Sequence, residues 1–148
     1  MKVVLRGSSG LISLLGTRTS PPASRQAEVL RRGSAGRVQI GMTALDVLEE
    51  FGSKAKFNEL NSRADVVSGR GKQRDPALSI EMTDGYVTAI QVFSPDYKTE
   101  NGIGPGDTLI ALANHYPIRW TEDNTVEVRE LGMKFTFAKD QITSVILS

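Results

Sequence analysis

The stretch that decides the fold is GMTALDVLEEFG, residues 41–52, because a segment of the same design, GDTLIALANHYP, recurs at residues 106–117. In both, a threonine, Thr43 or Thr108, precedes apolar residues at the spacing i, i+3, i+4, i+7, which predicts a short amphipathic helix capped by the threonine hydroxyl. The predicted apolar stripes are Ala44, Val47, Leu48 and Phe51 in the first helix, and Leu109, Leu112, Ala113 and Tyr116 in the second. Gly52 and Pro117 are the expected helix ends.

Two strand segments recur as well. LSIEM at 78–82 is echoed by MKFTF at 133–137, and VTAIQV at 87–92 by ITSVIL at 142–147. Alternation of apolar and polar residues predicts strands with one buried face, and Asp84-Gly85 and Lys139-Asp140 predict the hairpin turns between them. In the later strand of each pair the apolar residues step by three and then by two, which predicts a β-bulge near Thr88-Ala89 and Thr143-Ser144.

The repeated order of elements predicts an α+β fold. We expect a tandem duplicated unit of one helix and antiparallel strands, forming one curved sheet with the helices on one face. The units are residues 38–93 and 103–148, joined by a linker at 94–102, within one domain of residues 38–148. The connectors 53–77 and 118–132 differ in length, as surface hairpins can at little entropic cost.

Charge is unevenly distributed along the chain. Residues 1–37 hold seven basic residues against one acidic residue, a net charge of +6, whereas residues 38–148 hold 11 basic and 16 acidic residues, a net charge of −5. We therefore expect residues 1–37 to be a basic, disordered leader, and the mildly acidic body argues against a nucleic-acid-binding surface. The apolar run LISLL at 11–15 is shorter than the 7 to 15 residues of a signal peptide, so a periplasmic or secreted location, organellar import and an untargeted tail all stay open.

Composition excludes several kinds of chemistry. The chain has no cysteine, which excludes disulfides, thiolate metal ligands, cysteine nucleophiles and lipid attachment at cysteine. No apolar run approaches the roughly 20 residues that span a membrane as a helix. The sequence also offers no paired carboxylates or nucleophile motif, and we predict no cofactor and no metal site.

The sequence IGMT at 40–43, leading into a helix that closes at Phe51-Gly52 and then a hairpin ending in a Val-x-x-Ile strand, resembles a known fold. It is shared by the β-lactamase inhibitor protein and the small lipoprotein of the outer-membrane β-barrel assembly machine. The stretch TENGIGPGDT at 99–108 is similar to the linker of uncharacterised bacterial envelope proteins of that kind. The resemblance covers residues 38–148 and implies a binding or assembly protein rather than an enzyme. This sequence has no cysteine for lipid attachment and no residues that match a known inhibitory loop, so neither lipid anchoring nor β-lactamase inhibition is implied.

We therefore expect a non-enzymatic protein-binding module, of inhibitor, immunity or envelope-assembly type, that uses the exposed sheet face. Aromatic anchors beside polar side chains are typical of protein interfaces. The residues expected to contact the partner protein are Trp120, Tyr97, Arg129, Lys134, Glu127 and Glu81.

Three other features bear on function. His115, the only histidine, and Tyr97 keep open the alternative of a small hydrolase or small-ligand carrier, with a pocket near these two residues between the helices and the linker. Arg70, Lys72 and Arg74 form a basic segment that is a candidate for an anionic surface or an acidic partner. GIGPG at 102–106 is expected to be a turn, because no lysine follows it and Asp107 places negative charge where a phosphate would sit.

Overall fold

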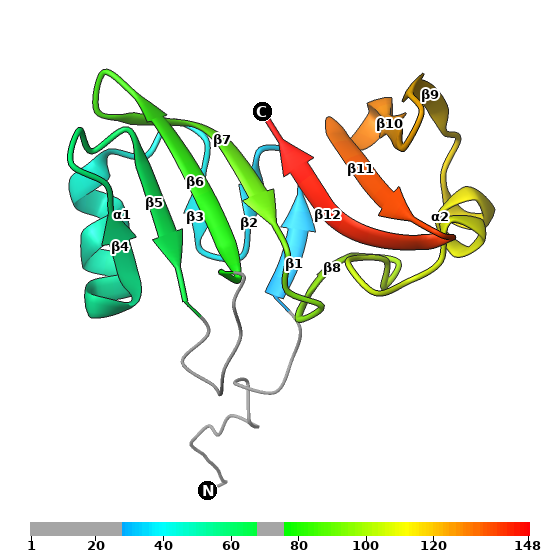
Figure 1. Cartoon of the computed structure of the whole chain (residues 1–148), viewed down its shortest axis with the longest axis horizontal. Coiled ribbons are helices and arrows are strands. Elements are labelled where there is room, and N and C mark those ends of the chain that lie inside the picture. Colours follow the sequence, from blue (N-terminus) through cyan, green and yellow to red (C-terminus); the bar gives the residue numbers. More distant parts are fainter. Residues whose placement is uncertain (1–27, 68–75) are drawn as a thin grey trace, which may run out of the picture.

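The computed structural model describes residues 28–67 and 76–148, and shows an α+β fold in which strands predominate (Figure 1). The described residues form an eight-stranded antiparallel sheet in the order β4-β5-β6-β7-β12-β11-β10-β9 and a four-stranded sheet in the order β3-β2-β1-β8. Two α-helices, one from each half of the chain, accompany them in this described part.

Each half of the domain contains one α-helix followed by four strands of the large sheet, but the short 3₁₀ turn follows the helix in the first half and the second strand in the second half. The first half consists of α1 (Ala44–Phe51), the 3₁₀ turn η2 (Gly52–Lys54), β4 (Ala55–Phe57), β5 (Arg63–Val66), β6 (Leu78–Thr83) and β7 (Tyr86–Val92). The second consists of α2 (Leu109–His115), β9 (Arg119–Glu122), β10 (Thr125–Val128), the 3₁₀ turn η3 (Arg129–Leu131), β11 (Met133–Ala138) and β12 (Gln141–Leu147). The short strand β8 (Tyr97–Thr99) lies in the linker.

Both helices begin where the sequence predicts. The Thr43 hydroxyl accepts a hydrogen bond from the Asp46 amide at 3.1 Å, and the Thr108 hydroxyl accepts one from the Ala111 amide at 3.1 Å. The predicted stripes are only partly confirmed, because Val47 and Leu112 are fully buried whereas Leu48 and Ala113 are exposed. The strip of each helix that is covered is thus narrower than the sequence pattern indicates.

The two predicted bulges are confirmed by the strand register. In the first half, Glu81 pairs with Ala89 and Met82 with Val87, so Thr88 between them has no partner. In the second half, Thr136 pairs with Ser144 and Phe137 with Ile142, so Thr143 is left out in the same way. The hairpin turns also form as predicted, with positive φ at Asp84 and Gly85 in one and at Lys139 and Asp140 in the other. Two bulges in neighbouring central strands bend the sheet.

The amino-terminal boundary differs from the expectation. Strands β1 (Glu28–Arg31), β2 (Ser34–Ala35) and β3 (Val38–Gln39) form part of the small sheet, with Leu30 and Ala35 in the core. The folded body thus includes residues 28–37, which the sequence placed in a disordered leader on the basis of their arginines and glycines. The arginine side chains of this segment are exposed to solvent. The segment is ordered because β1 pairs with β8 and β2, which composition alone does not reveal. Residues 1–27 of the predicted leader lie outside the described residues.

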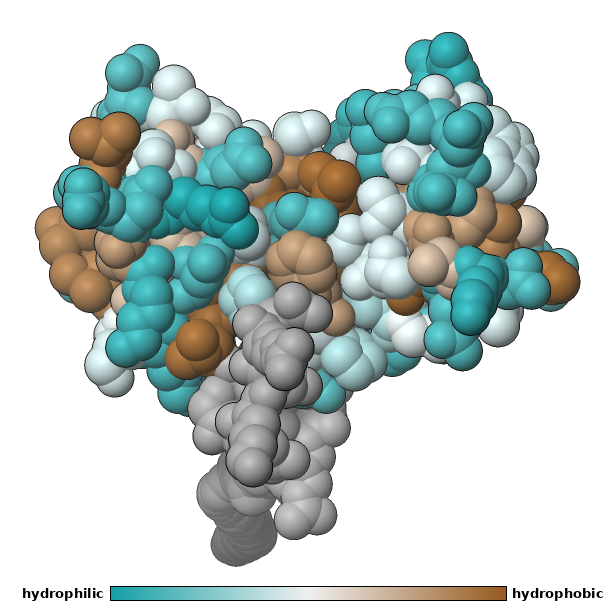
Figure 2. Space-filling view, viewed as in Figure 1, coloured by the Kyte–Doolittle hydropathy of each residue, from teal (hydrophilic) through white to brown (hydrophobic). Residues whose placement is uncertain are grey.

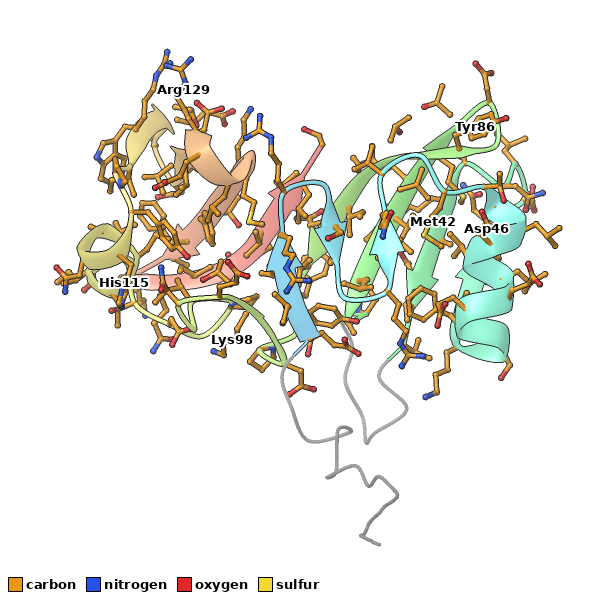
Figure 3. The ribbon with its side chains drawn as sticks, turned by 180° about the vertical axis from the view of Figure 1, so that it is seen from behind. Met42, Asp46, Tyr86, Lys98, His115 and Arg129 are labelled. Carbon is orange, nitrogen blue, oxygen red and sulfur yellow. The ribbon has the colours of Figure 1, made fainter. Side chains whose placement is uncertain are left out.

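One hydrophobic core joins the two halves. At the centre of the large sheet, Ile90 of β7 pairs with Leu147 of β12 and Val92 pairs with Val145, and all four side chains are fully buried. The same cluster takes in Val47 of α1, Leu112 of α2, and the buried residues of the small sheet. Figure 3 shows α1 and the strands β1 to β3 in front of the first half of the large sheet. The apolar face of that sheet is therefore its packed face.

The linker is held to the residues that follow it by an ion pair and hydrogen bonds. The Asp107 carboxylate accepts from the Gly104 amide at 2.8 Å and pairs with the Lys98 ammonium at 2.8 Å. The buried Tyr116 hydroxyl donates to the Thr99 hydroxyl at 3.0 Å. The GIGPG segment is therefore a turn closed by Asp107, as the sequence predicts.

Candidate functional site

The face of the large sheet opposite the core carries one unbroken row of side chains, which we call the polar row. Its members are directly opposite one another from strand to strand and run Lys56, Asp65, Ser79, Gln91, Ile146, Lys134, Glu127 and Arg119. In every strand except β9 the member of the row alternates with core residues, which is why the row lies on the other face, and Arg119 of β9 shares that face because it pairs with Glu127. We call this face of the large sheet the polar face.

Charge is arranged along the row in a simple pattern. Lys56 and Asp65 flank it on one side, and Lys134, Glu127 and Arg119 on the other, whereas the centre consists of Ser79, Gln91 and Ile146. Figure 2, viewed as Figure 1, shows mainly hydrophilic and neutral residues on this side, with apolar residues in separate patches. An uncharged centre between charged flanks is thus the main electrostatic feature of the polar face.

The central strands β7, β12 and β11 also carry a connected group of hydroxyl and amide side chains on this face. The Gln91 amide donates to the Ser144 hydroxyl at 3.2 Å, Ser144 shares a short hydrogen bond with Thr136, and Thr136 lies 3.1 Å from the Thr143 hydroxyl. Ser144 is only 3% exposed although it belongs to the polar face. These bonds hold the side chains at the centre in defined positions.

Three of the sequence-predicted contact residues lie together on the polar face. Lys134 and Glu127 are direct neighbours in the polar row, and Glu81 faces Arg63 on the adjoining strand. Glu81 and Lys134 are exposed, and Glu127 is half-buried. The alternation of apolar and polar residues thus correctly predicts the face on which a side chain lies wherever the strand is regular.

Trp120 and Arg129 lie elsewhere. Trp120 pairs with the buried Val126 and its ring meets the edge of Phe137 with centroids 5.5 Å apart, so it lies on the core side of the sheet, although its side chain is 58% exposed. Arg129 belongs to η3 rather than to a strand, and its carbonyl accepts a hydrogen bond from Arg32 at 3.0 Å. The sequence could not indicate either position. The face on which Trp120 lies depends on the irregularity at Thr121, and the place of Arg129 depends on where β10 ends.

Tyr97 is 8% exposed, which differs from the exposed anchor expected at the rim. Its burial, with a smaller contribution from the negative charge of Glu28, raises the pKa of its phenol to about 12. His115 is exposed at the end of α2, 6.4 Å from the ring of Tyr116 (Figure 3). A pocket using both His115 and Tyr97 would require the phenol to be accessible, so this arrangement does not favour the hydrolase or carrier alternative.

The remaining predicted site cannot be placed, since Arg70, Lys72 and Arg74 lie outside the described residues. Sequence reasoning also missed six residues that the structure brings into the polar row, namely Lys56, Asp65, Ser79, Gln91, Arg119 and Ile146. Gln91 and Ile146 meet only when β7 and β12 pair, and Lys56, Asp65 and Arg119 lie in connectors that the sequence predicts only as hairpins, so no local pattern indicates them.

Two further observations concern the described residues alone. They contain no group of three or more histidine, aspartate or glutamate side chains placed to hold a metal ion. None of their helices is both long enough and apolar enough to cross a membrane.

Comparison with known proteins gives a fold and no function. No protein-family model matches the chain, and none of the curated proteins matches it either. The chain is similar to the crystal structure of the uncharacterized protein YfeY from Escherichia coli, with a TM-score of 0.52 and 14% sequence identity over 81% of this chain and 98% of that chain. At this identity the likeness shows a shared fold, and the function has to be argued from the polar face.

Proposed function

We propose that this protein is a non-enzymatic protein-binding module that contacts its partner through the polar face. The class is that implied by the sequence resemblance, an inhibitor, immunity or envelope-assembly protein. The observation that carries the proposal is the uncharged centre of the polar row between two charged flanks. Across eight strands, with seven spacings of about 4.8 Å, the row extends for about 34 Å, which is wide enough for a protein surface.

Physical chemistry favours this face for binding. The cores of protein interfaces are depleted of charged residues and their rims are polar, which is the distribution seen along the polar row. Gln91 and Ile146 can be covered by a partner without desolvating a full charge, whereas Lys56, Asp65 and Arg119 remain at the solvated margin, where they orient the partner. Because the side chains stand on a hydrogen-bonded sheet, little conformational entropy is lost when they are covered.

We also infer that the two halves of the domain are tandem copies of one unit. The supporting features are paired contacts at equivalent places. Thr43 forms a bridge with Tyr86 and Thr108 one with Gln141, while the Gly41 amide donates to Val87 and the Gly106 amide to Ile142, both at 2.8 Å. A duplicated unit would place two equivalent half-faces side by side, and so make one surface wider than a single unit could offer.

The test introduces a charge at the uncharged centre. Ile146→Glu should weaken binding to a partner, isolated by affinity capture and then purified, by at least about tenfold, because the new carboxylate must be desolvated at the interface. The matched control is Leu45→Glu, which introduces the same charge at an exposed position of α1. Both variants should keep the wild-type circular dichroism spectrum. Equal affinities for Ile146→Glu and the wild type would contradict the proposal, as would an equal loss in both variants.

A further inference from the structure

The two outer edges of the large sheet have different properties. All four residues of β9 are exposed, and among the described strands only β10 pairs with it. At the opposite edge, β4 is partly covered, with Ala55 buried and Phe57 packed against the core. An edge strand presents backbone amides and carbonyls that can pair with another strand. The edge at β9 is therefore the more accessible of the two.

The sequence of β9, Arg-Trp-Thr-Glu, is complementary to itself in the antiparallel direction. If two copies pair about the midpoint between Trp120 and Thr121, Arg119 of each lies directly opposite Glu122 of the other. The β4 edge behaves in the opposite way, since the same operation on Ala-Lys-Phe would set Lys56 against Lys56 of the second copy. Opposite charges facing each other across strands stabilise a pair, and like charges destabilise it.

The irregularity in β9 makes this ion pair sterically feasible. Arg119 pairs with Glu127 and Glu122 with Thr125, whereas Trp120 pairs with Val126, so the register shift leaves Thr121 as the extra residue. Arg119 and Glu122 consequently lie on the same face, the polar face, although three positions separate them. In an unbroken strand they would point to opposite faces.

Trp120 adds apolar area to the same contact. Its indole lies on the core side of the sheet and is 58% exposed in the single chain. In the antiparallel arrangement the two Trp120 side chains become diagonal neighbours on that side, within reach of each other. Each would cover part of the exposed ring of the other.

We propose that β9 is a homotypic pairing edge, through which two copies of this chain join antiparallel about a two-fold axis. The interface is isologous, so the Arg119–Glu122 contact occurs twice. The same charges oppose pairing with most other strands, which makes the edge selective for its own sequence. A four-residue edge buries less surface than a permanent dimer needs, so association is expected only at high protein concentration.

The experiment is sedimentation equilibrium of the full chain over a wide concentration range, with emission from the single tryptophan followed in parallel. A monomer–dimer equilibrium should appear, and the emission should move to shorter wavelength as dimer forms. Arg119→Glu and Glu122→Arg should each raise the dimer dissociation constant by about tenfold or more, because two like-charge contacts replace two ion pairs. The double variant Arg119→Glu/Glu122→Arg should restore the wild-type value.

Lys56→Glu, at the other edge, is the matched control and should leave the equilibrium unchanged. A chain that stays monomeric throughout overturns the proposal. So does a double variant that is no better than the single variants, or an equal effect of Lys56→Glu. Ile146→Glu, which tests the polar face, should not change this equilibrium, so the two proposals can fail separately.

Discussion

Gly104 lies just after the linker, where the chain folds back against Tyr97. A Cβ atom there would overlap the backbone oxygen of Tyr97, which cannot rotate away. Gly104→Ala should therefore lower the free energy of unfolding by at least about 3 kcal/mol, the upper end of the usual overpacking cost, as measured by urea denaturation.

Gly102→Ala is the control for this prediction. Gly102 has φ of 81°, and no neighbouring atom lies within 4 Å of the place that an alanine methyl group would take, so its replacement should cost only backbone strain, about 1–2 kcal/mol. Equal stability of the two variants would contradict the prediction that the close approach to Tyr97 leaves no room for a side chain at Gly104.

Tyr97 makes stability depend on pH in the alkaline range. Its pKa is raised to about 12 by burial in the folded state, above the ordinary value of 10.0. Above pH 10 the unfolded chain releases this proton more readily than the folded chain, so stability falls as the pH rises from 10 towards 12. The contribution of this group to the loss should approach about 2–3 kcal/mol by pH 12.

Urea denaturation of the wild type and of Tyr97→Phe at pH 9, 10 and 11 isolates that contribution. The wild type should lose stability more steeply above pH 10 than the phenylalanine variant, which lacks the ionisable phenol. Parallel pH profiles for the two proteins would show that Tyr97 does not titrate differently in the folded and unfolded states.

At the scale of the elements, the two helix caps can be compared directly. Thr43→Ala and Thr108→Ala each remove one side-chain hydrogen bond to a helix amide and should each cost about 1 kcal/mol. The loss at Thr43 should be the smaller, because the Asp46 carboxylate accepts from the backbone amide of residue 43 at 3.2 Å, a bond that the alanine variant keeps and that has no counterpart at Thr108. Thermal denaturation of both variants, with Thr→Ser replacements that retain the hydroxyl, checks this order.

Elements with a periodic pattern could be predicted from sequence, and irregular ones could not. Thr43 and Thr108, the alternating strands and the skipped residues Thr88 and Thr143 all leave a signal within a few neighbouring positions. The strand at Glu28–Arg31 leaves none, because its order comes from pairing with β8, almost 70 residues away. The polar row has the same limitation. Its members were only partly identified because the row exists only once β7 and β12 are paired.

At the scale of the whole molecule, the pairing of β7 with β12 at the centre of the large sheet makes the domain one folding unit. Ile90 and Val92 from the first half and Val145 and Leu147 from the second are fully buried against one another, and neither half has a separate core. A half of this size also buries too little surface to be stable alone. A large-to-small substitution in the core of one half should therefore destabilise both halves.

The position of the single tryptophan makes this testable. Trp120 belongs to the second half, whereas Ile80, fully buried in β6, belongs to the first. Ile80→Ala should lower stability by about 2–5 kcal/mol. At a protein concentration low enough to keep the chain monomeric, the Trp120 fluorescence transition in urea should shift to lower denaturant by the same amount as the far-ultraviolet circular dichroism transition. A tryptophan transition that stayed at its wild-type midpoint would mean that the second half unfolds independently. The continuous polar face would then consist of two separately folding parts, and a partner that covers the centre of the polar row would itself have to hold them together.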